Sequence, residues 1–272
     1  MKCIALLNNP SIPRSAEVAK TVATSLKKAG IKVVTRDSGI SSLDPTSIDY
    51  IISIGGDGTI LNLLHEFEAI NAPILGINLG HLGFMADVLE NEIDAALEKL
   101  LSGDFSVEDR IMIEGGGSST RCFAANEIVI HRGSNPSLVE IAIYVGGTYF
   151  NTFEADGIII ATPNGSTAYS LAAGGPIISP SLDALVITPI SPHTISNRPF
   201  VITADKEITI EYQSPYKPIE ITADGLPPFP LAQNETFRIN RSSRKFRLVK
   251  LHDGKDYFAT IRAKLGWSGK LR

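Results

Sequence analysis

The sequence YIISIGGDGT at residues 50–59 combines an apolar run, a glycine-rich turn and the expected start of a helix. Glycines let the backbone turn tightly and bring its N–H groups close to a bound anion. The helix N-terminus behind them adds the positive end of a helix dipole, so the segment predicts a phosphate-binding loop. Asp57 is unexpected there, because a carboxylate repels phosphate unless it accepts a proton or holds Mg²⁺. An isolated Gly-Asp-Gly is more often a plain turn, but a strand-to-helix junction favours the binding loop.

Strands and helices alternate on both sides of this loop. The strands and helices that we predict lie, in chain order, at residues 2–7, 15–29, 31–35, 49–54, 59–70, 73–78 and 91–101. We expect Ser15 to cap the first helix, and Gly30 and Gly103 to end the first and last. Repeated strand–helix units predict a parallel sheet with helices on its faces. Residues 1–103 are therefore predicted to form an α/β, Rossmann-like domain.

The composition changes after Gly103 to many short β-type runs. The predicted strands are residues 125–131, 139–145, 148–153, 157–161, 184–190, 198–203, 207–212, 219–223, 236–239 and 245–251. Gly146-Gly147 fits a tight type I′ hairpin between two of them, and the one convincing helix runs from about Thr167 to Ala172. We predict a β-rich, β-sandwich-like domain over residues 104–251. The tail at residues 252–272 is expected to pack back on the first domain.

Charge and cysteine content exclude several classes of protein. The 272 residues carry a formal net charge of −4, which argues against binding to nucleic acid or to a membrane surface. Two cysteines are too few for a disulfide framework, so we expect a reducing compartment, the cytoplasm. Residues 157–197 carry one formal charge, Asp183, but five prolines interrupt every window long enough to span a membrane.

A second strand, polar turn and helix start follow within that uncharged stretch. Asp156 precedes an isoleucine strand, and residues 162–170 (TPNGSTAYS) supply hydroxyl and amide groups suited to ribose, amide or phosphate recognition. A capped helix that binds nothing is the alternative. The chain has no Walker GxxxxGK[ST], no GxGxxG and no GxSxG pattern. Its five histidines lie too far apart for a local metal motif, so no protein metal ligand is predicted.

Four segments together resemble the NAD kinase family. They are GGDGT at residues 55–59, NLGHLGF at 78–84, the Asn126-Glu127 pair, and DGIIIATPNGSTAY at 156–169. The similarity covers most of the chain and is least distinctive at residues 10–48 and 100–120. GGDGT alone is shared with diacylglycerol-type lipid kinases, whereas the long fourth segment is far more specific.

The resemblance implies transfer of the ATP γ-phosphate to the 2′-hydroxyl of the adenosine ribose of NAD, giving NADP. Asp57 would accept the proton of that hydroxyl. Asn126 and Glu127 would bind the adenosine part of NAD, and Asp156 the nicotinamide-side ribose. The remaining implied binding residues are Gly55, Gly56, Gly58 and Thr59 for the phosphates, and Ser166, Thr167, Ala168, Tyr169, Ser170, Leu171 and Ala172 for NAD.

The family also implies a divalent metal, Mg²⁺ bound with ATP, an active site between the two domains, and a homodimer or homotetramer. Many bacterial members carry Gln after the late Asp-Gly pair, whereas this chain has Leu226, so no ligand role is assigned to it. A contact near Ser137 is not assigned either. A lipid kinase with the same loop and a non-catalytic dinucleotide sensor stay open as alternatives.

Overall fold

The computed structural model describes residues 3–36, 40, 44–80, 83–117, 120–194, 196–251 and 257–267. The chain divides into two compact units, Met1–Asp109 with Arg247–Arg272 and Arg110–Phe246. Strands β6 (Phe105–Gly116) and β17 (Thr236–Leu251) each run across the boundary in sequence. The predicted functional domains, 1–103 and 104–251, stay a prediction.

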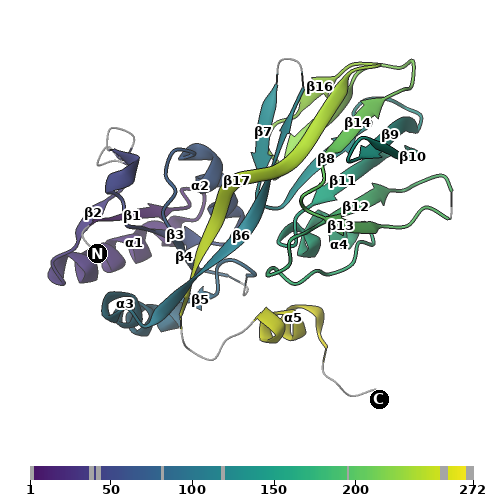
Figure 1. Ribbon diagram of the computed structural model, residues 1–272. Helices are drawn as coiled ribbons and strands as arrows, with labels where there is room; N and C mark the ends of the chain where they lie inside the picture. Colours follow the sequence, from purple (N-terminus) through teal and green to yellow (C-terminus); the bar gives the residue numbers. More distant parts are fainter. Residues whose placement is uncertain are drawn as a thin grey trace. The chain divides into compact units, whose positions relative to one another are not determined.

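Unit 1 contains a parallel sheet (Figure 1). Its strands, in spatial order, are β2 (Lys32–Val34), β1 (Cys3–Asn8), β3 (Tyr50–Gly55) and β4 (Ile74–Asn78), with β5 (Val88–Leu89) beside β4. Each neighbouring pair is parallel. The predicted α/β architecture is therefore confirmed.

Helices cover both faces of this sheet. The helices that do so are α1 (Pro13–Lys28), α2 (Asp57–Glu66) and α3 (Ile93–Ser102). Unit 1 also contains the short helices η2 (Pro45–Ser47) and η3 (Glu90–Glu92) and the C-terminal α5 (Tyr257–Leu265). Helices α1 and α3 bury their apolar faces in one cluster with Ile52 and Leu75. Successive strand residues point to opposite faces. A Cβ on Gly76 would lie 2.8 Å from Cδ1 of Ile60 in α2, so α2 covers the other face.

Two helix starts differ from the prediction. Helix α1 begins at Pro13, and Ser15 does not cap it. The Ser15 hydroxyl is buried and donates to the Asn9 carbonyl at 2.5 Å, which ties the helix to the end of β1. Helix α2 begins at Asp57, two residues before the predicted start. The predicted stop of α3 is confirmed, because Gly103 has φ = 81° in the left-handed region.

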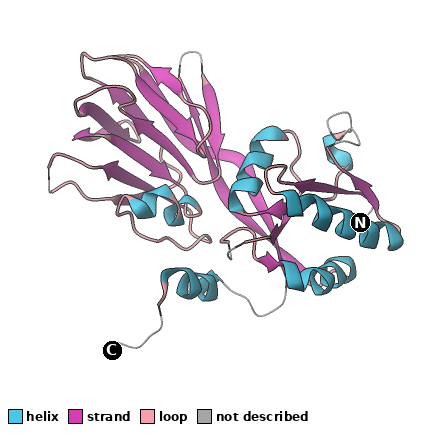
Figure 2. Ribbon diagram, turned by 180° about the vertical axis from the view of Figure 1, so that it is seen from behind, coloured by secondary structure: helices cyan, strands magenta, loops and turns pink. Residues whose placement is uncertain are grey.

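Unit 2 consists mainly of antiparallel strands, and helices are scarce there (Figure 2). One sheet has the order β10 (Thr148–Ala155), β9 (Val139–Val145), β14 (Ile208–Tyr212) and β17, and β6 pairs with β17 and β7 (Arg121–Ala124). The other has the order β13 (Phe200–Thr203), β12 (Ala184–Ile190), β11 (Gly157–Ala161), β8 (Glu127–His131), β15 (Ile219–Ala223) and β16 (Phe229–Leu231).

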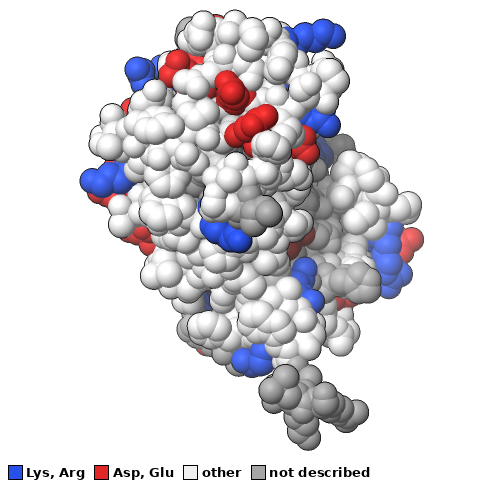
Figure 3. Space-filling model, turned by 90° about the vertical axis from the view of Figure 1, so that its right-hand side faces the viewer, with Lys and Arg blue, Asp and Glu red and all other residues white. Residues whose placement is uncertain are grey.

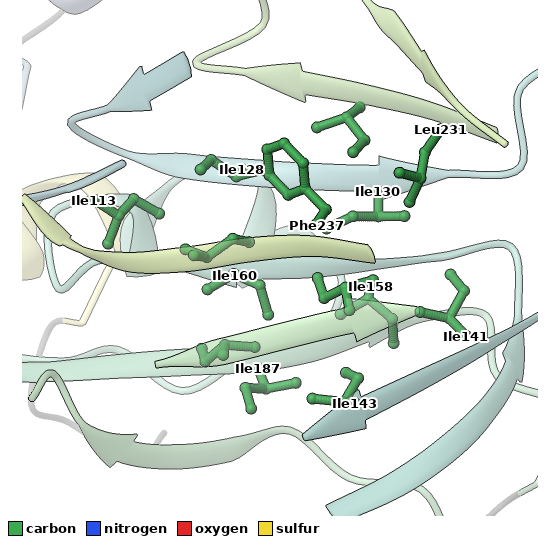
Figure 4. Close-up of a cluster of buried hydrophobic side chains, with 14 of the residues drawn as sticks. Ile113, Ile128, Ile130, Ile141, Ile143, Ile158, Ile160, Ile187, Leu231 and Phe237 are labelled. Atoms are coloured by element: carbon green, nitrogen blue, oxygen red, sulfur yellow. The ribbon is translucent and has the colours of Figure 1, made fainter. Parts of the chain in front are cut away.

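The two sheets of unit 2 share one hydrophobic core. Ile141 and Phe237 from the first sheet and Ile158 and Ile187 from the second belong to the same buried cluster, and Figure 4 shows these side chains between the strands. Inward-facing side chains from two sheets are the packing of a β-sandwich. The predicted β-sandwich-like domain is confirmed, as is the tight Gly146-Gly147 hairpin, whose φ angles are 57° and 78°.

Three predictions about the β-rich part were incomplete. Strands β6, β7 and β16 were not predicted, β17 is one strand where two were predicted, and α5 is a second helix after the one near Thr167. The predicted helix 167–172 forms as a short 3₁₀ turn, η4 (Gly165–Thr167), followed by α4 (Tyr169–Ala172). Among the described residues, no helix is long and apolar enough to cross a membrane. On the face shown in Figure 3, Lys and Arg side chains lie scattered and form no large patch.

Candidate functional site

A pocket of about 520 Å³ in unit 1 lies at the ends of β1, β3 and β4. The carboxyl ends of parallel strands are where open α/β sheets bind ligands. The residues that line it are Asn9, Ile12, Gly55, Gly56, Asp57, Gly58, Thr59, Asn62, Asn78, Leu79, Gly80, Gly83 and Lys264. All five predicted phosphate-loop residues, 55–59, therefore line one pocket.

Close packing around Thr59 holds the glycine loop. A Cβ on Gly55 would lie 2.2 Å from Oγ1 of Thr59, so only glycine fits there. The same oxygen accepts hydrogen bonds from the backbone N–H of Gly56 at 3.3 Å and from Nδ2 of Asn9 at 3.2 Å. Gly56 and Gly58 have open space where a Cβ would stand. Their bare backbone, at the N-terminus of α2, can therefore approach a phosphate closely.

Asp57 is anchored by a neighbouring loop. Its carboxylate accepts three backbone hydrogen bonds, from the N–H groups of Phe84 (2.8 Å), Met85 (3.1 Å) and Ala86 (2.9 Å). Gly83 passes so close that a Cβ there would lie 2.0 Å from Oδ1 of Asp57. Asn78 braces the same loop, because its Nδ2 donates to the Ala86 carbonyl at 3.2 Å. The segment 78–84 thus positions the acidic residue of the segment 55–59; His81 and Leu82 lie outside the described residues.

Helix α5 contributes a residue that the sequence did not indicate. Lys264 lines the pocket, and its Nζ lies 4.9 Å from the centroid of the Phe84 ring. The Tyr257 ring also packs near Phe84, with centroids 6.1 Å apart. A lysine near the end of a chain, far from any motif, carries no local signal of a binding role.

In unit 2, Asp224 holds the turn that contains Asn126 and Glu127. Its carboxylate accepts hydrogen bonds from the backbone N–H groups of Ala125 (2.8 Å), Asn126 (2.8 Å) and Glu127 (3.2 Å). Asp224 has φ = 50°, a left-handed conformation in which Asn and Asp are enriched. The sequence pattern singled out its neighbour Leu226, but the structural contacts are made by Asp224.

The predicted turn at residues 162–165 is bound to the Asn126 turn. Asn164 donates from Nδ2 to Oδ1 of Asn126 at 2.5 Å, and Arg110 donates to the side-chain oxygen of Asn164. The Thr162 hydroxyl donates to the Ala125 carbonyl at 2.6 Å. A Cβ on Gly165 would lie 2.2 Å from the Asn126 carbonyl oxygen. The Asn126-Glu127 pair and the segment 156–169, both of which carry the family resemblance, are therefore joined by hydrogen bonds.

The predicted binding residues 166–172 differ in their access to a ligand. Ser166 and Ser170 are fully buried: the Ser166 hydroxyl donates to the Pro163 carbonyl at 2.6 Å, and the Ser170 hydroxyl bonds that of Thr188 at 2.8 Å. Tyr169 is 42% exposed. The others, Thr167, Ala168, Leu171 and Ala172, are partly or well exposed. The side chains of these four residues and of Tyr169 can reach a ligand, whereas the two buried serines stabilise the turn through hydrogen bonds.

Asp156 lies in the connection from β10 to β11 and pairs with a cation. Its Oδ1 is 2.7 Å from Nε of Arg132, and both side chains are about a third exposed, at 28% and 31%. The backbone N–H of Arg132 also donates to the Asp156 carbonyl at 2.9 Å. The carboxylate is thus held in place yet open to solvent.

Burial raises the pKa of Glu127 to about 8, and the charge of Asp224 adds to this shift, while a hydrogen bond from the Tyr169 backbone opposes it. Its Oε2 has no hydrogen-bond partner among the described residues. Burial away from water favours the neutral form of a carboxyl group. The protonated form of Glu127 is therefore favoured near neutral pH.

The protonated state of Glu127 makes stability fall as pH rises. The folded chain holds this proton more tightly than the unfolded chain, whose glutamate has its ordinary pKa of 4.5. The stabilisation is complete below about pH 4.5 and is lost as pH rises towards 8. We expect the Tm difference between Glu127→Gln, which stays neutral, and the wild type to grow in favour of the variant by at least about 3 °C as the pH rises from 5 to 8.5. The exposed Glu140→Gln is the control, and an equal pH response in both variants would contradict the assignment.

Comparisons with known proteins agree on one family. The model of the ATP-NAD kinase N-terminal domain matches residues 38–105, and that of the C-terminal domain matches residues 125–251. A curated NAD kinase from Protochlamydia amoebophila (strain UWE25) is 49% identical over 278 residues, which cover 99% of this chain and 99% of that protein.

Two solved structures share the fold. The crystal structure of yeast NADH kinase complexed with NADH has a TM-score of 0.88 and 25% sequence identity, and the match covers 100% of this chain and 89% of that one. The NAD kinase from Archaeoglobus fulgidus in complex with ATP has a TM-score of 0.77 at 24% identity, covering 96% and 99%. The chain belongs to the NAD kinase family and is an enzyme, a phosphotransferase that uses ATP to phosphorylate NAD.

Proposed function

We propose that the phosphoryl acceptor is the 2′-hydroxyl of the adenosine ribose of NAD, that the donor is the γ-phosphate of ATP, and that the reaction takes place in the cytoplasm. The observation that carries this proposal is Asp57, a fixed carboxylate in a pocket otherwise suited to phosphates. A site that only bound phosphate would be weakened by a carboxylate. A site that must also remove a proton from a hydroxyl needs one.

The glycine loop and the N-terminus of α2 bind the donor phosphates in this proposal. Gly56 and Gly58 leave the backbone bare, and first-turn N–H groups of a helix lack partners within the helix. Asp57 accepts the proton of the attacking hydroxyl. Its hydrogen bonds to the 84–86 loop support this role, since they hold the carboxylate in one orientation while the reacting groups meet.

The residues of unit 2 bind the dinucleotide. Asn126 and Glu127 take the adenosine part, and Asp156 takes the nicotinamide-side ribose. Glu127 in its neutral form can donate as well as accept a hydrogen bond, which suits a ribose hydroxyl. The exposed side chains among residues 167–172 contact the nicotinamide base, while the buried Ser166 and Ser170 hold the turn in its conformation through their hydrogen bonds.

A divalent metal, Mg²⁺, fits this pocket only as a companion of ATP. The described residues contain no group of three His, Cys, Asp or Glu side chains that could hold a metal. Asp57 supplies one carboxylate and Asn62 an amide to the pocket. Mg²⁺ is commonly held by one or two carboxylates together with substrate phosphates and water, which matches this set. When bound, the ion neutralises charge on the transferred phosphoryl group.

The domain boundaries and the assembly complete the proposal. We assign residues 1–103 to phosphate binding and 104–251 to NAD binding, and we propose a homodimer or homotetramer. Exposed apolar side chains on the edge strand β13 support the assembly: Phe200 is 47% and Val201 43% exposed. A solution mass equal to one chain would contradict this part.

A coupled assay tests the activity. The full chain is incubated with Mg²⁺ and ATP, and with NAD, NADH or diacylglycerol as the acceptor. NADP is detected with an NADP-specific dehydrogenase, which identifies the 2′-phosphate. We expect NADP from NAD and no phosphorylated lipid. Lipid phosphorylation without NADP would favour the lipid kinase, and dinucleotide binding without any product would favour a sensor.

A further inference from the structure

We propose that Lys264, on the C-terminal helix α5, binds a phosphate group of the ATP donor. This inference rests on the phosphate role proposed for the glycine loop, and it adds a residue from another part of the chain to that site. The pocket as a whole suggests the role, because Lys264 lines it together with residues that follow β1, residues of the 55–59 loop and residues at the end of β4.

The charges in the pocket require a cation. Among the residues that line it, Asp57 and Lys264 are the two that carry charge. ATP brings about four negative charges at neutral pH, because its phosphate groups are largely ionised there. Like charges this close repel each other, and the repulsion is stronger near a protein surface than in water. The ammonium group of Lys264 offsets the carboxylate, so the pocket can accept a polyanion beside Asp57.

The charge of Lys264 is available to a ligand. Within the described part of the chain, no carboxylate lies within 4.0 Å of its Nζ to form an ion pair. Its partner is the face of the Phe84 ring, 4.9 Å from Nζ to centroid. An aromatic face attracts an ammonium group without cancelling its charge. Lysine is a common phosphate ligand because its ammonium group is a compact point charge on a long, flexible side chain.

Phe84 places the lysine and the carboxylate relative to each other. Its backbone N–H donates to Oδ2 of Asp57 at 2.8 Å, while its ring lies under Lys264. The ring of Tyr257, at the start of α5, packs near the same ring, and Ile261 is 4% exposed. Helix α5 is therefore fixed at this loop by apolar contacts, which leaves the ammonium group free to meet a ligand.

The test compares three variants of the full chain. Lys264→Met removes the charge but keeps an apolar stem over the Phe84 ring, and Lys264→Arg keeps the charge. Arg262→Met removes a charge of the same sign from an exposed position on the same helix that does not line the pocket. Isothermal titration calorimetry measures the Kd of ATP and of tripolyphosphate, each with Mg²⁺, and the coupled assay measures the KM of ATP and NAD.

We expect Lys264→Met to weaken ATP and tripolyphosphate about 10- to 100-fold, the usual range for one hydrogen bond to a charged group. The KM of NAD should change less than about two-fold, Lys264→Arg should stay within a few-fold of the wild type, and Arg262→Met should match it. If Lys264→Met binds both ligands as tightly as the wild type, or if Arg262→Met weakens them equally, the proposal is wrong. Calorimetry needs no turnover, so a wild type that binds ATP through Lys264 but makes no NADP would refute only the proposed function.

Discussion

Replacing Asp57 with asparagine lowers kcat about 100-fold or more at saturating ATP and NAD, the scale of a lost general base. A 100-fold loss corresponds to about 2.7 kcal/mol of transition-state free energy. The amide cannot take the proton from the attacking hydroxyl. Because the carboxylate accepts three backbone hydrogen bonds and one amide oxygen cannot replace both carboxylate oxygens, the 84–86 loop is also loosened. Steady-state kinetics and the Kd of NAD separate the two effects.

The Kd of NAD should remain within a few-fold of the wild type in Asp57→Asn, because the proposed dinucleotide contacts lie elsewhere. Asp87→Asn is the matched control: Asp87 directly follows the 84–86 loop and pairs with Lys250 at 2.6 Å, but it does not line the pocket. This control should lower kcat less than about two-fold. Full turnover in Asp57→Asn would end the assignment of Asp57 as the proton acceptor.

Replacing Gly165 with alanine destabilises the protein by about 3 kcal/mol, at the upper end of the usual cost of overpacking. The added Cβ would lie 2.2 Å from the carbonyl oxygen and 2.5 Å from the carbonyl carbon of Asn126. Backbone atoms cannot rotate away as a side chain can, so the 126 turn and the 162–165 turn must move apart. Thermal unfolding should show a Tm about 6–12 °C lower.

Gly116→Ala provides the comparison for Gly165→Ala. Gly116 also lies in unit 2, but a Cβ there would make ordinary contacts at 3.6 and 3.7 Å. Its Tm should change by less than about 2 °C. We also expect the KM of NAD to rise in Gly165→Ala and not in Gly116→Ala, since the moved turn carries Asn126. Similar Tm values for the two variants would show that the two turns do not need their close contact.

Regular local patterns made the first unit predictable. Short apolar runs marked β1, β3 and β4, and the periodic residues Val18, Val22 and Leu26, which are buried as expected, marked α1. Helix starts were less certain, because Ser15 looks like a cap in sequence but its hydroxyl bonds the preceding loop. Capping depends on where a side chain points, which a sequence pattern does not specify.

Strands with polar middles were the hardest to predict. The segment 105–110 contains Glu108, Asp109 and Arg110, and these charged residues interrupt the apolar pattern that would otherwise predict strand β6. The polar residues 240–244 likewise divide β17 in the sequence pattern. In the structure the first part of β17 pairs with β14, and Leu248 pairs with Ile74 of β4. Backbone pairing carries a strand through polar residues, because the N–H and C=O groups that form the ladder are present in every residue except proline.

The sequence by itself determined the two-part α/β and β-rich architecture, the family, and a glycine loop built around Asp57, because these depend on periodicity and on residues close together in the chain. Only the tertiary structure decided what surrounds the candidate site residues. Asp57 is held from 27 to 29 residues away, the Asn126 turn is held by Asp224 from 97 to 99 residues away, and Lys264 comes from a C-terminal helix without any motif. Such contacts arise when folding brings distant segments together, and hydrogen bonds and ring packing between them leave no regular spacing in the sequence.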